Sequence, residues 1–270
     1  MVFDDKVAEE YVKQQIVLEN AQQVLECAKP YIKPGCEILD FGCGPGFASR
    51  MLAALPEVKS VLGADVSEGM LGQFNKLAAE ENEQVRSKLS SLKTSANPVE
   101  ELKPHVGSKD LVVMAFVVGH LHPREAGYEV VKLAAACLKP GGRFLLAELN
   151  GGAPFHAAGG GHGHGHEHGH GHEHGHGHEH GHGHEHGHGH EHGQGQETSS
   201  CHEHGHGHGH GHGHGHGHEH AHDEHEVYYE DQLHDLLAKA GMSGIKTEKG
   251  YKFTKNNVTV NCAVISGVRE

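Results

Sequence analysis

The sequence has no apolar run approaching the roughly 18 residues that a membrane-spanning helix needs, so we expect no transmembrane segment. Its first residues, MVFDDKVAEEYVKQQ, are charged and lack the apolar core of a secretory signal. The six cysteines form no Cys-x-x-Cys pair and no disulfide-like cluster, which favours a reducing compartment. Together these absences predict a cytoplasmic protein.

Basic residues are also scarce, because 22 Lys and Arg stand against 36 Asp and Glu and the formal net charge is −14 at pH 7. Nucleic-acid phosphates require clustered Lys and Arg, so we expect no nucleic-acid partner. This net charge treats histidine as neutral, whereas near pH 6.5 about half of exposed imidazoles carry a proton. The charge of the molecule therefore depends strongly on pH.

The 40 glycines and 33 histidines are far above ordinary usage, and nearly all of the excess lies between residues 151 and 226. Without that segment about two hundred residues of ordinary globular composition remain, enough for one buried α/β core. We therefore predict one monomeric domain made of residues 1–158 and 226–270. Residues 159–225 are then a low-complexity insertion, called the tract below.

Helical and strand patterns alternate along the rest of the chain. Helical patterns span residues 5–29, 47–55, 68–85 and 228–242, and residues 124–142 are typical of a helix followed by a turn. The spacing within residues 5–29 places Leu18 roughly on an apolar face, and Ser67 is the expected N-cap of the helix over residues 68–85. Strand patterns span residues 36–41, 59–67, 88–96, 110–120, 143–150, 245–254 and 256–269, with Asn256-Asn257 as a hairpin turn. This alternation predicts a doubly wound α/β fold, with helices on both faces of a mostly parallel sheet and one antiparallel strand.

The most informative motif is ILDFGCGPGFAS, residues 38–49. Three glycines, at positions 42, 44 and 46, remove side chains where a ligand would need to approach the backbone. Asp40 places a carboxylate at the strand end, suited to an ammonium or a hydroxyl group. Asp65 ends the next strand, where nucleotide-binding α/β proteins carry the acid that accepts ribose hydroxyls.

A dinucleotide site is the rival interpretation of this loop. Its G-x-G-x-x-G spacing would require a third glycine at the position of Phe47. Asp40 would also repel a diphosphate but would not repel a zwitterionic amino-acid group. Both features favour a ligand that carries an amino-acid moiety.

Five motifs in this order, LDFGCGPG, GADVSEGML, DLVVMAFVVGHLH, LKPGGRFLLAE and YEDQLHDLLAKAGM, resemble the class I S-adenosylmethionine-dependent methyltransferases with a type 11/25-like domain. The resemblance implies a Rossmann-like seven-stranded sheet of order 3-2-1-4-5-7-6 with strand 7 antiparallel. It also implies that the glycine loop holds the methionine part of the cofactor, that Asp65 binds the ribose and that Met70 and its neighbours flank the adenine. The implied cofactor-binding set is Asp40, Gly42, Cys43, Gly44, Gly46, Asp65, Val66, Met70, Asn97 and Phe116.

Methyl transfer from a sulfonium is an in-line displacement in which the cofactor carries the electrophile. The enzyme mainly aligns donor and acceptor, and it needs a base only if the acceptor starts protonated. His120 and His156 are the candidates for that base or for an acceptor contact, although a packing role for His120 remains open. We expect the acceptor to be a small molecule.

The tract repeats the six-residue unit EHGHGH, and its apparent break, GQGQETSSCHEH, keeps the same phase. Alternating glycine and the near absence of apolar residues predict disorder. Dense imidazoles predict chelation of Zn, Ni or Cu(II). The alternatives are a metal-buffering or interaction protein built on a methyltransferase-like scaffold, and a tolerated repeat expansion. The representative metal ligands are His162, His164, His166, His168, His170, His172, His204, His206 and His208.

Overall fold

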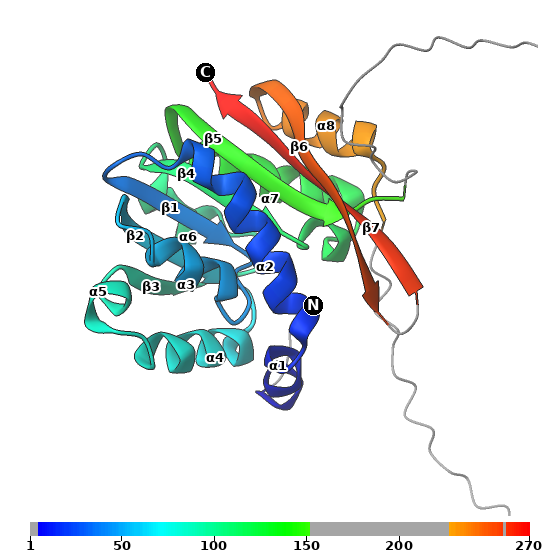
Figure 1. Ribbon diagram of the computed structural model, residues 1–270. Helices are drawn as coiled ribbons and strands as arrows, with labels where there is room; N and C mark the ends of the chain where they lie inside the picture. Colours follow the sequence, from blue (N-terminus) through cyan, green and yellow to red (C-terminus); the bar gives the residue numbers. More distant parts are fainter. Residues whose placement is uncertain (1–4, 152–226, 256–257) are drawn as a thin grey trace, which may run out of the picture. The chain divides into compact units, whose positions relative to one another are not determined.

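The computed structural model describes residues 5–151, 227–255 and 258–270 (Figure 1). Within these residues seven strands form one sheet of order β3-β2-β1-β4-β5-β7-β6. The strands β1 to β5 run parallel to one another, and β7 is antiparallel to both β5 and β6. The predicted strand order and directions are therefore confirmed. The strands are β1 (Cys36–Phe41), β2 (Val58–Asp65), β3 (Leu89–Lys93), β4 (Lys109–Ala115), β5 (Leu138–Leu149), β6 (Met242–Lys255) and β7 (Val258–Arg269).

Helices cover both faces of the sheet, and each face has its own apolar cluster. The helices α2, α3 and α5 contribute to one cluster, and α6, α7 and α8 contribute to the other. The α-helices are α1 (Asp5–Val12), α2 (Gln15–Ala28), α3 (Phe47–Ala53), α4 (Glu68–Ala79), α5 (Glu83–Arg86), α6 (Val99–Leu102), α7 (Arg124–Ala136) and α8 (Glu230–Lys239). Three short 3₁₀ helices are η1 (Lys29–Tyr31), η2 (Lys103–His105) and η3 (Val118–His120).

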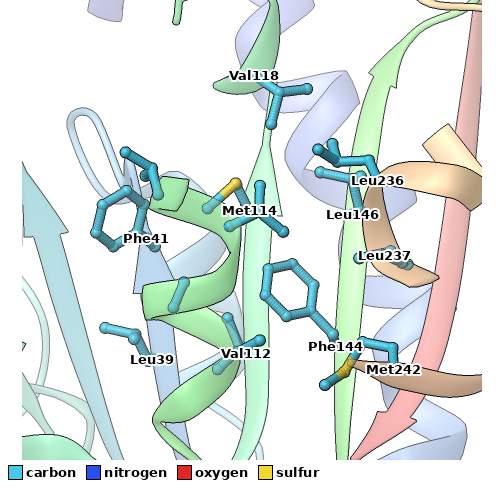
Figure 2. Close-up of a cluster of buried hydrophobic side chains, with 14 of the residues drawn as sticks. Leu39, Phe41, Val112, Met114, Val118, Phe144, Leu146, Leu236, Leu237 and Met242 are labelled. Atoms are coloured by element: carbon cyan, nitrogen blue, oxygen red, sulfur yellow. The ribbon is translucent and has the colours of Figure 1, made fainter. Parts of the chain in front are cut away.

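In the central strand β4, residues 111–115 are all apolar, because both faces of the strand are covered. Leu111 and Val113 belong to the cluster beneath α2 and α3, whereas Val112 and Met114 belong to the cluster beneath α7 and α8. Figure 2 shows Val112 and Met114 beside Phe144 of β5 in that second cluster. Because successive side chains point to opposite faces, a strand covered on both sides must be apolar throughout.

The helix predicted over residues 5–29 is broken in the structure. It forms α1 and α2, and Gln14 between them has an extended backbone with φ −78° and ψ 116°. The two pieces pack against different elements, α1 against α4 and α2 against α3, so one straight helix would not serve both contacts. Leu18, placed on the apolar face by its spacing, is 37% exposed.

The helix predicted over residues 68–85 is also divided, into α4 and α5. The predicted N-cap of α4 is confirmed, because the Ser67 hydroxyl accepts a hydrogen bond of 3.2 Å from the backbone N–H of Met70. Asn82 caps α5 in the same way through Val85. A second capping side chain inside the helical pattern therefore marks where α5 begins.

The chain leaves the sheet for the tract and returns to it at neighbouring positions. Gly151 donates a backbone hydrogen bond of 2.9 Å to Tyr228, and Tyr228 donates one of 3.3 Å to Leu149. Tyr228 is itself buried at 2% exposure. The tract with its predicted metal ligands, its predicted boundaries at residues 159 and 225, and the Asn256-Asn257 turn lie outside the described residues. No helix in the described part of the chain is long and apolar enough to cross a membrane.

Candidate functional site

A cavity of about 750 Å³ lies at the carboxyl ends of β1, β4 and β5. Helices α1 and α2 supply one wall, and the β6–β7 pair supplies part of another. Its size is typical of a pocket for a cofactor-sized ligand. The carboxyl ends of the strands are also where ligands bind in open α/β sheets, so this cavity is the candidate active site.

Only part of the predicted site lines this cavity. The predicted residues in its lining are Asp40, Gly42, Cys43, Gly44, Phe116 and His120. The predicted residues that belong to the described chain but not to this lining are Gly46, Asp65, Val66, Met70 and Asn97. Met70 is buried in α4, Asn97 is exposed after β3, and His156 lies outside the described residues. Their assignment to the cofactor therefore stays a prediction.

The three loop glycines have different surroundings in the structure. A Cβ on Gly42 would lie 2.2 Å from a methyl carbon of Val117, and one on Gly46 would lie 2.3 Å from the Phe74 ring. These two glycines make room for the protein's own side chains. A Cβ on Gly44 meets no heavy atom within 4 Å, so only Gly44 is open toward a ligand. All three have positive φ, which glycine adopts without strain.

Asp40 presents a nearly enclosed carboxylate to the cavity. It is 2% exposed, and its Oδ2 accepts a hydrogen bond of 2.5 Å from the Ser49 hydroxyl on α3. Burial raises the pKa of Asp40 to about 6, and the nearby charge of Asp65 adds to this rise. A bound cation would stabilise the ionised form, so the position suits an ammonium group.

Asp65 links the end of β2 to the glycine loop. Its Oδ2 accepts a hydrogen bond of 2.8 Å from the Gly44 N–H, and its Oδ1 accepts one of 2.8 Å from the Ser67 N–H. Burial nevertheless raises its pKa. The Val66 N–H also acts on this carboxylate, and the remaining lone pairs leave Asp65 able to accept a hydroxyl group. Burial raises the pKa of Tyr11 on α1, and the charge of Asp65 adds to that rise.

The segment after β4 carries Phe116 and His120 into the cavity lining. The strand predicted over residues 110–120 ends earlier, at Ala115, because Phe116 has φ +57°, a conformation that does not continue a strand. The Phe116 N–H donates a hydrogen bond of 2.8 Å to the Ala147 carbonyl. Buried Glu148 of β5 fixes the rest of the segment by accepting a 3.1 Å hydrogen bond from the Gly119 N–H.

Glu148 is a residue that the sequence analysis missed. Its other oxygen accepts a 2.7 Å hydrogen bond from the Leu149 N–H, and burial raises the pKa of its carboxyl to about 8. The signal available in the sequence was a single acid at the end of the apolar strand RFLLAELN. That carboxylate positions the turn that leads to His120.

Several further lining residues were also missed because they come from elements distant in sequence. Phe253 of β6 and Val260 of β7 are cross-strand partners and both line the cavity. From α2, Asn20 lines it and accepts a hydrogen bond of 3.2 Å from the Tyr251 hydroxyl. The alternating polar and apolar pattern of the last two strands was visible in the sequence. Which face of these strands lines the cavity depends on how the two strands pair.

Cys43 is a buried packing residue of the glycine loop. A Cβ on Gly63 would lie 3.0 Å from its Sγ, so the thiol fills space against β2. Burial raises its pKa well above that of an ordinary thiol. Because the thiolate is the reactive form, this environment disfavours nucleophilic chemistry at Cys43.

Known proteins resemble this chain in part of the sequence and in the fold. Residues 38–142 match a family model described as a methyltransferase domain. An uncharacterized methyltransferase of Schizosaccharomyces pombe is 29% identical over 150 residues, which cover 54% of this chain and 50% of that protein. The chain spans about half the length of the curated relatives it matches.

Two solved structures illustrate the shared fold. A methyltransferase from Aquifex aeolicus, described as dependent on S-adenosylmethionine, has a TM-score of 0.54 at 16% identity, covering 99% of this chain and 100% of that chain. The magnesium protoporphyrin IX methyltransferase of Synechocystis, solved with bound S-adenosylmethionine, has a TM-score of 0.53 at 13% identity, covering 94% and 79%. Together, the family match shows a methyltransferase domain over residues 38–142, and the sheet order and solved structures show the seven-stranded Rossmann-like fold of methyltransferases.

Proposed function

We propose that the protein transfers the methyl group of S-adenosylmethionine to a small-molecule acceptor. The observation that carries this proposal is a single cavity that joins the open backbone of Gly44 and the carboxylate of Asp40 to apolar residues of α2, β6 and β7. A cavity of about 750 Å³ suits a cofactor together with an acceptor of modest size.

The residues of the glycine loop fit the cofactor by their chemistry. Asp40 would pair with the ammonium of its amino-acid part, and Gly44 would allow close approach of the backbone. Asp65, which already holds the Gly44 N–H, would accept ribose hydroxyls through its remaining lone pairs. When bound, the cofactor supplies an electrophilic methyl group on a sulfonium.

The remaining work of the protein is alignment and exclusion of water. Helices α1 and α2 wall the cavity on one side, which shields a bound donor from solvent. His120 is placed to take a proton from an acceptor that enters protonated. The Glu148 hydrogen bond to Gly119 keeps His120 in the lining.

The test is methyl transfer from radiolabelled S-adenosylmethionine into a fractionated cell extract. We expect label in the small-molecule fraction, and we expect Gly44→Ala to abolish the transfer. Glu80→Ala, which changes an exposed acid after α4, serves as the matched control and keeps full activity. Label confined to protein or nucleic acid would contradict a small-molecule acceptor.

We also propose that the tract binds Zn, Ni or Cu(II), on the support of its sequence alone. Alternating imidazoles offer many interchangeable ligand sets, so binding arises from avidity rather than from one fixed site. In the described part of the chain, no three His, Cys, Asp or Glu side chains gather as metal ligands. Nickel binding by the full chain that persists after deletion of residues 159–224 would contradict this proposal.

The alternative is a metal-buffering protein on an inactive methyltransferase-like scaffold. It predicts that the tract binds metal while the core binds no cofactor. The open Gly44 and the enclosed Asp40 favour the methyltransferase, because an inactive scaffold has no use for a buried carboxylate facing a cavity.

A further inference from the structure

Charge is distributed unevenly around the candidate cavity. Its charged lining residues in the described chain are Lys6 and Glu10 of α1 and Asp40 beside the glycine loop. The lining residues that come from α2, β5, β6 and β7, called the apolar half below, are mainly aliphatic and aromatic, and none of these described residues carries a fixed charge. They include Ile16, Val17, Leu149, Phe253 and Val260.

Few polar side chains accompany this apolar half. Asn20 lines the cavity, and its Oδ1 accepts a hydrogen bond from the Tyr251 hydroxyl. His120 contributes an imidazole from η3. An ionic acceptor placed against the apolar half would lose its hydration without gaining a counter-charge from these residues.

From this asymmetry we infer that the acceptor is an uncharged, largely apolar molecule that presents a single hydroxyl group, as a phenol does. This inference rests on the proposed methyltransferase function. The apolar body lies between Val17, Phe253 and Val260, and the hydroxyl lies at His120. There the acceptor oxygen forms the bond to the methyl carbon and its proton passes to the imidazole. The electron pair of the broken carbon–sulfur bond stays on sulfur.

The test compares three fluorinated probes of similar size by ¹⁹F NMR on the full chain saturated with S-adenosylhomocysteine. The probes are 4-fluorophenol, 4-fluorobenzoate and 4-fluorobenzylammonium, which are neutral, anionic and cationic at pH 7. We expect 4-fluorophenol to bind at least on the order of tenfold more tightly than either ion, because only the ions lose hydration without compensation.

Variants locate the binding. Phe253→Asp places a charge in the apolar half and should weaken 4-fluorophenol binding by about tenfold or more. Thr254→Asp is the matched control, because Thr254 is the next residue of β6, is exposed and faces away from the cavity. Val17→Asp on α2 repeats the test from a second element, should Phe253→Asp fail to fold.

The outcomes separate this inference from the proposed function. If S-adenosylhomocysteine, followed by its own proton signals, does not bind, the methyltransferase proposal fails and the inference fails with it. If it binds but 4-fluorobenzoate or 4-fluorobenzylammonium binds as tightly as 4-fluorophenol, only the inference is overturned. Equal weakening by Thr254→Asp and Phe253→Asp would also overturn it.

Discussion

At the scale of single residues, the burial of Asp40, the proposed partner of the cofactor's ammonium group, carries a cost to stability. Burial raises its pKa to about 6, so the folded protein holds the proton more tightly than the unfolded chain does. Its contribution to stability is therefore fully present below its ordinary pKa of 3.8 and is lost as the pH rises toward 6. Above that pH the empty site carries an uncompensated buried charge.

Asp40→Asn should therefore stabilise the cofactor-free protein at pH 8 by roughly 3 kcal/mol, at about 1.36 kcal/mol per pKa unit. The gain should shrink as the pH falls toward 3, where the wild-type carboxyl is largely protonated in both states. The same substitution should weaken S-adenosylhomocysteine binding, because the ammonium loses its partner. Urea unfolding at the two pH values and calorimetry check the two effects. A variant less stable than wild type at pH 8 would contradict the burial argument.

Gly44 and Gly46 provide a matched pair, because both have positive φ but only Gly46 faces a crowded neighbour. Gly46→Ala should lose roughly 1–3 kcal/mol more stability than Gly44→Ala, since its Cβ would overlap the Phe74 ring. Gly44→Ala should fold with only the backbone penalty of about 1–2 kcal/mol but should bind cofactor poorly. Equal stability losses, or full cofactor affinity in Gly44→Ala, would contradict the distinction.

At the scale of elements, α1 is a cover over the cavity more than a part of the core. Within α1, Ala8 is the one residue described as fully buried, and neither apolar cluster of the sheet includes it. Yet Lys6, Glu10 and Tyr11 line the cavity. The break at Gln14 lets α1 turn away from the direction of α2 toward α4.

Deleting residues 1–13 should therefore lower the melting temperature only slightly while weakening S-adenosylhomocysteine binding by on the order of tenfold, because the ligand loses apolar cover. Differential scanning calorimetry and isothermal titration check the two results. A large loss of stability would show that α1 belongs to the core. Unchanged affinity would show that it does not cover the ligand.

The helices and strands also show how much of the fold could be predicted from the sequence. Strand and helix patterns, the Ser67 cap and the family motifs predicted the sheet order and the place of the glycine loop correctly. The break near Gln14 was missed because it depends on what each helix packs against, which periodicity does not contain. The place of Phe253 and Val260 in the cavity was missed for a similar reason, since it depends on strand pairing.

At the scale of the whole molecule, the tract is attached to a core that closes without it. Backbone hydrogen bonds of Tyr228, one from the Gly151 N–H and one to the Leu149 carbonyl, join the two sides of the described chain that flank the tract. Buried Tyr228 and the 3.0 Å hydrogen bond that the Tyr229 N–H donates to the Gln232 side chain then mark the start of α8. The core therefore has its own closure at this point.

Deleting residues 159–224 should change the melting temperature by no more than a few degrees when metal is chelated. Shortening a loop alters its closure entropy by only about 0.6 kcal/mol per halving of length. Thermal unfolding of the full chain and the deletion, both in chelator, makes the comparison. A larger fall would mean that residues of the tract pack against the core.

The central claim is that this core binds the methyl donor through the glycine loop and Asp65. Isothermal titration of S-adenosylhomocysteine into wild type, Asp65→Ala and the control Glu80→Ala tests it most directly. We predict clear binding by wild type and by Glu80→Ala. We predict a loss of about 1–3 kcal/mol for Asp65→Ala, roughly a 5- to 150-fold weakening, because ribose hydroxyls lose their acceptor. No binding by wild type, or equal affinity in Asp65→Ala, would contradict the account.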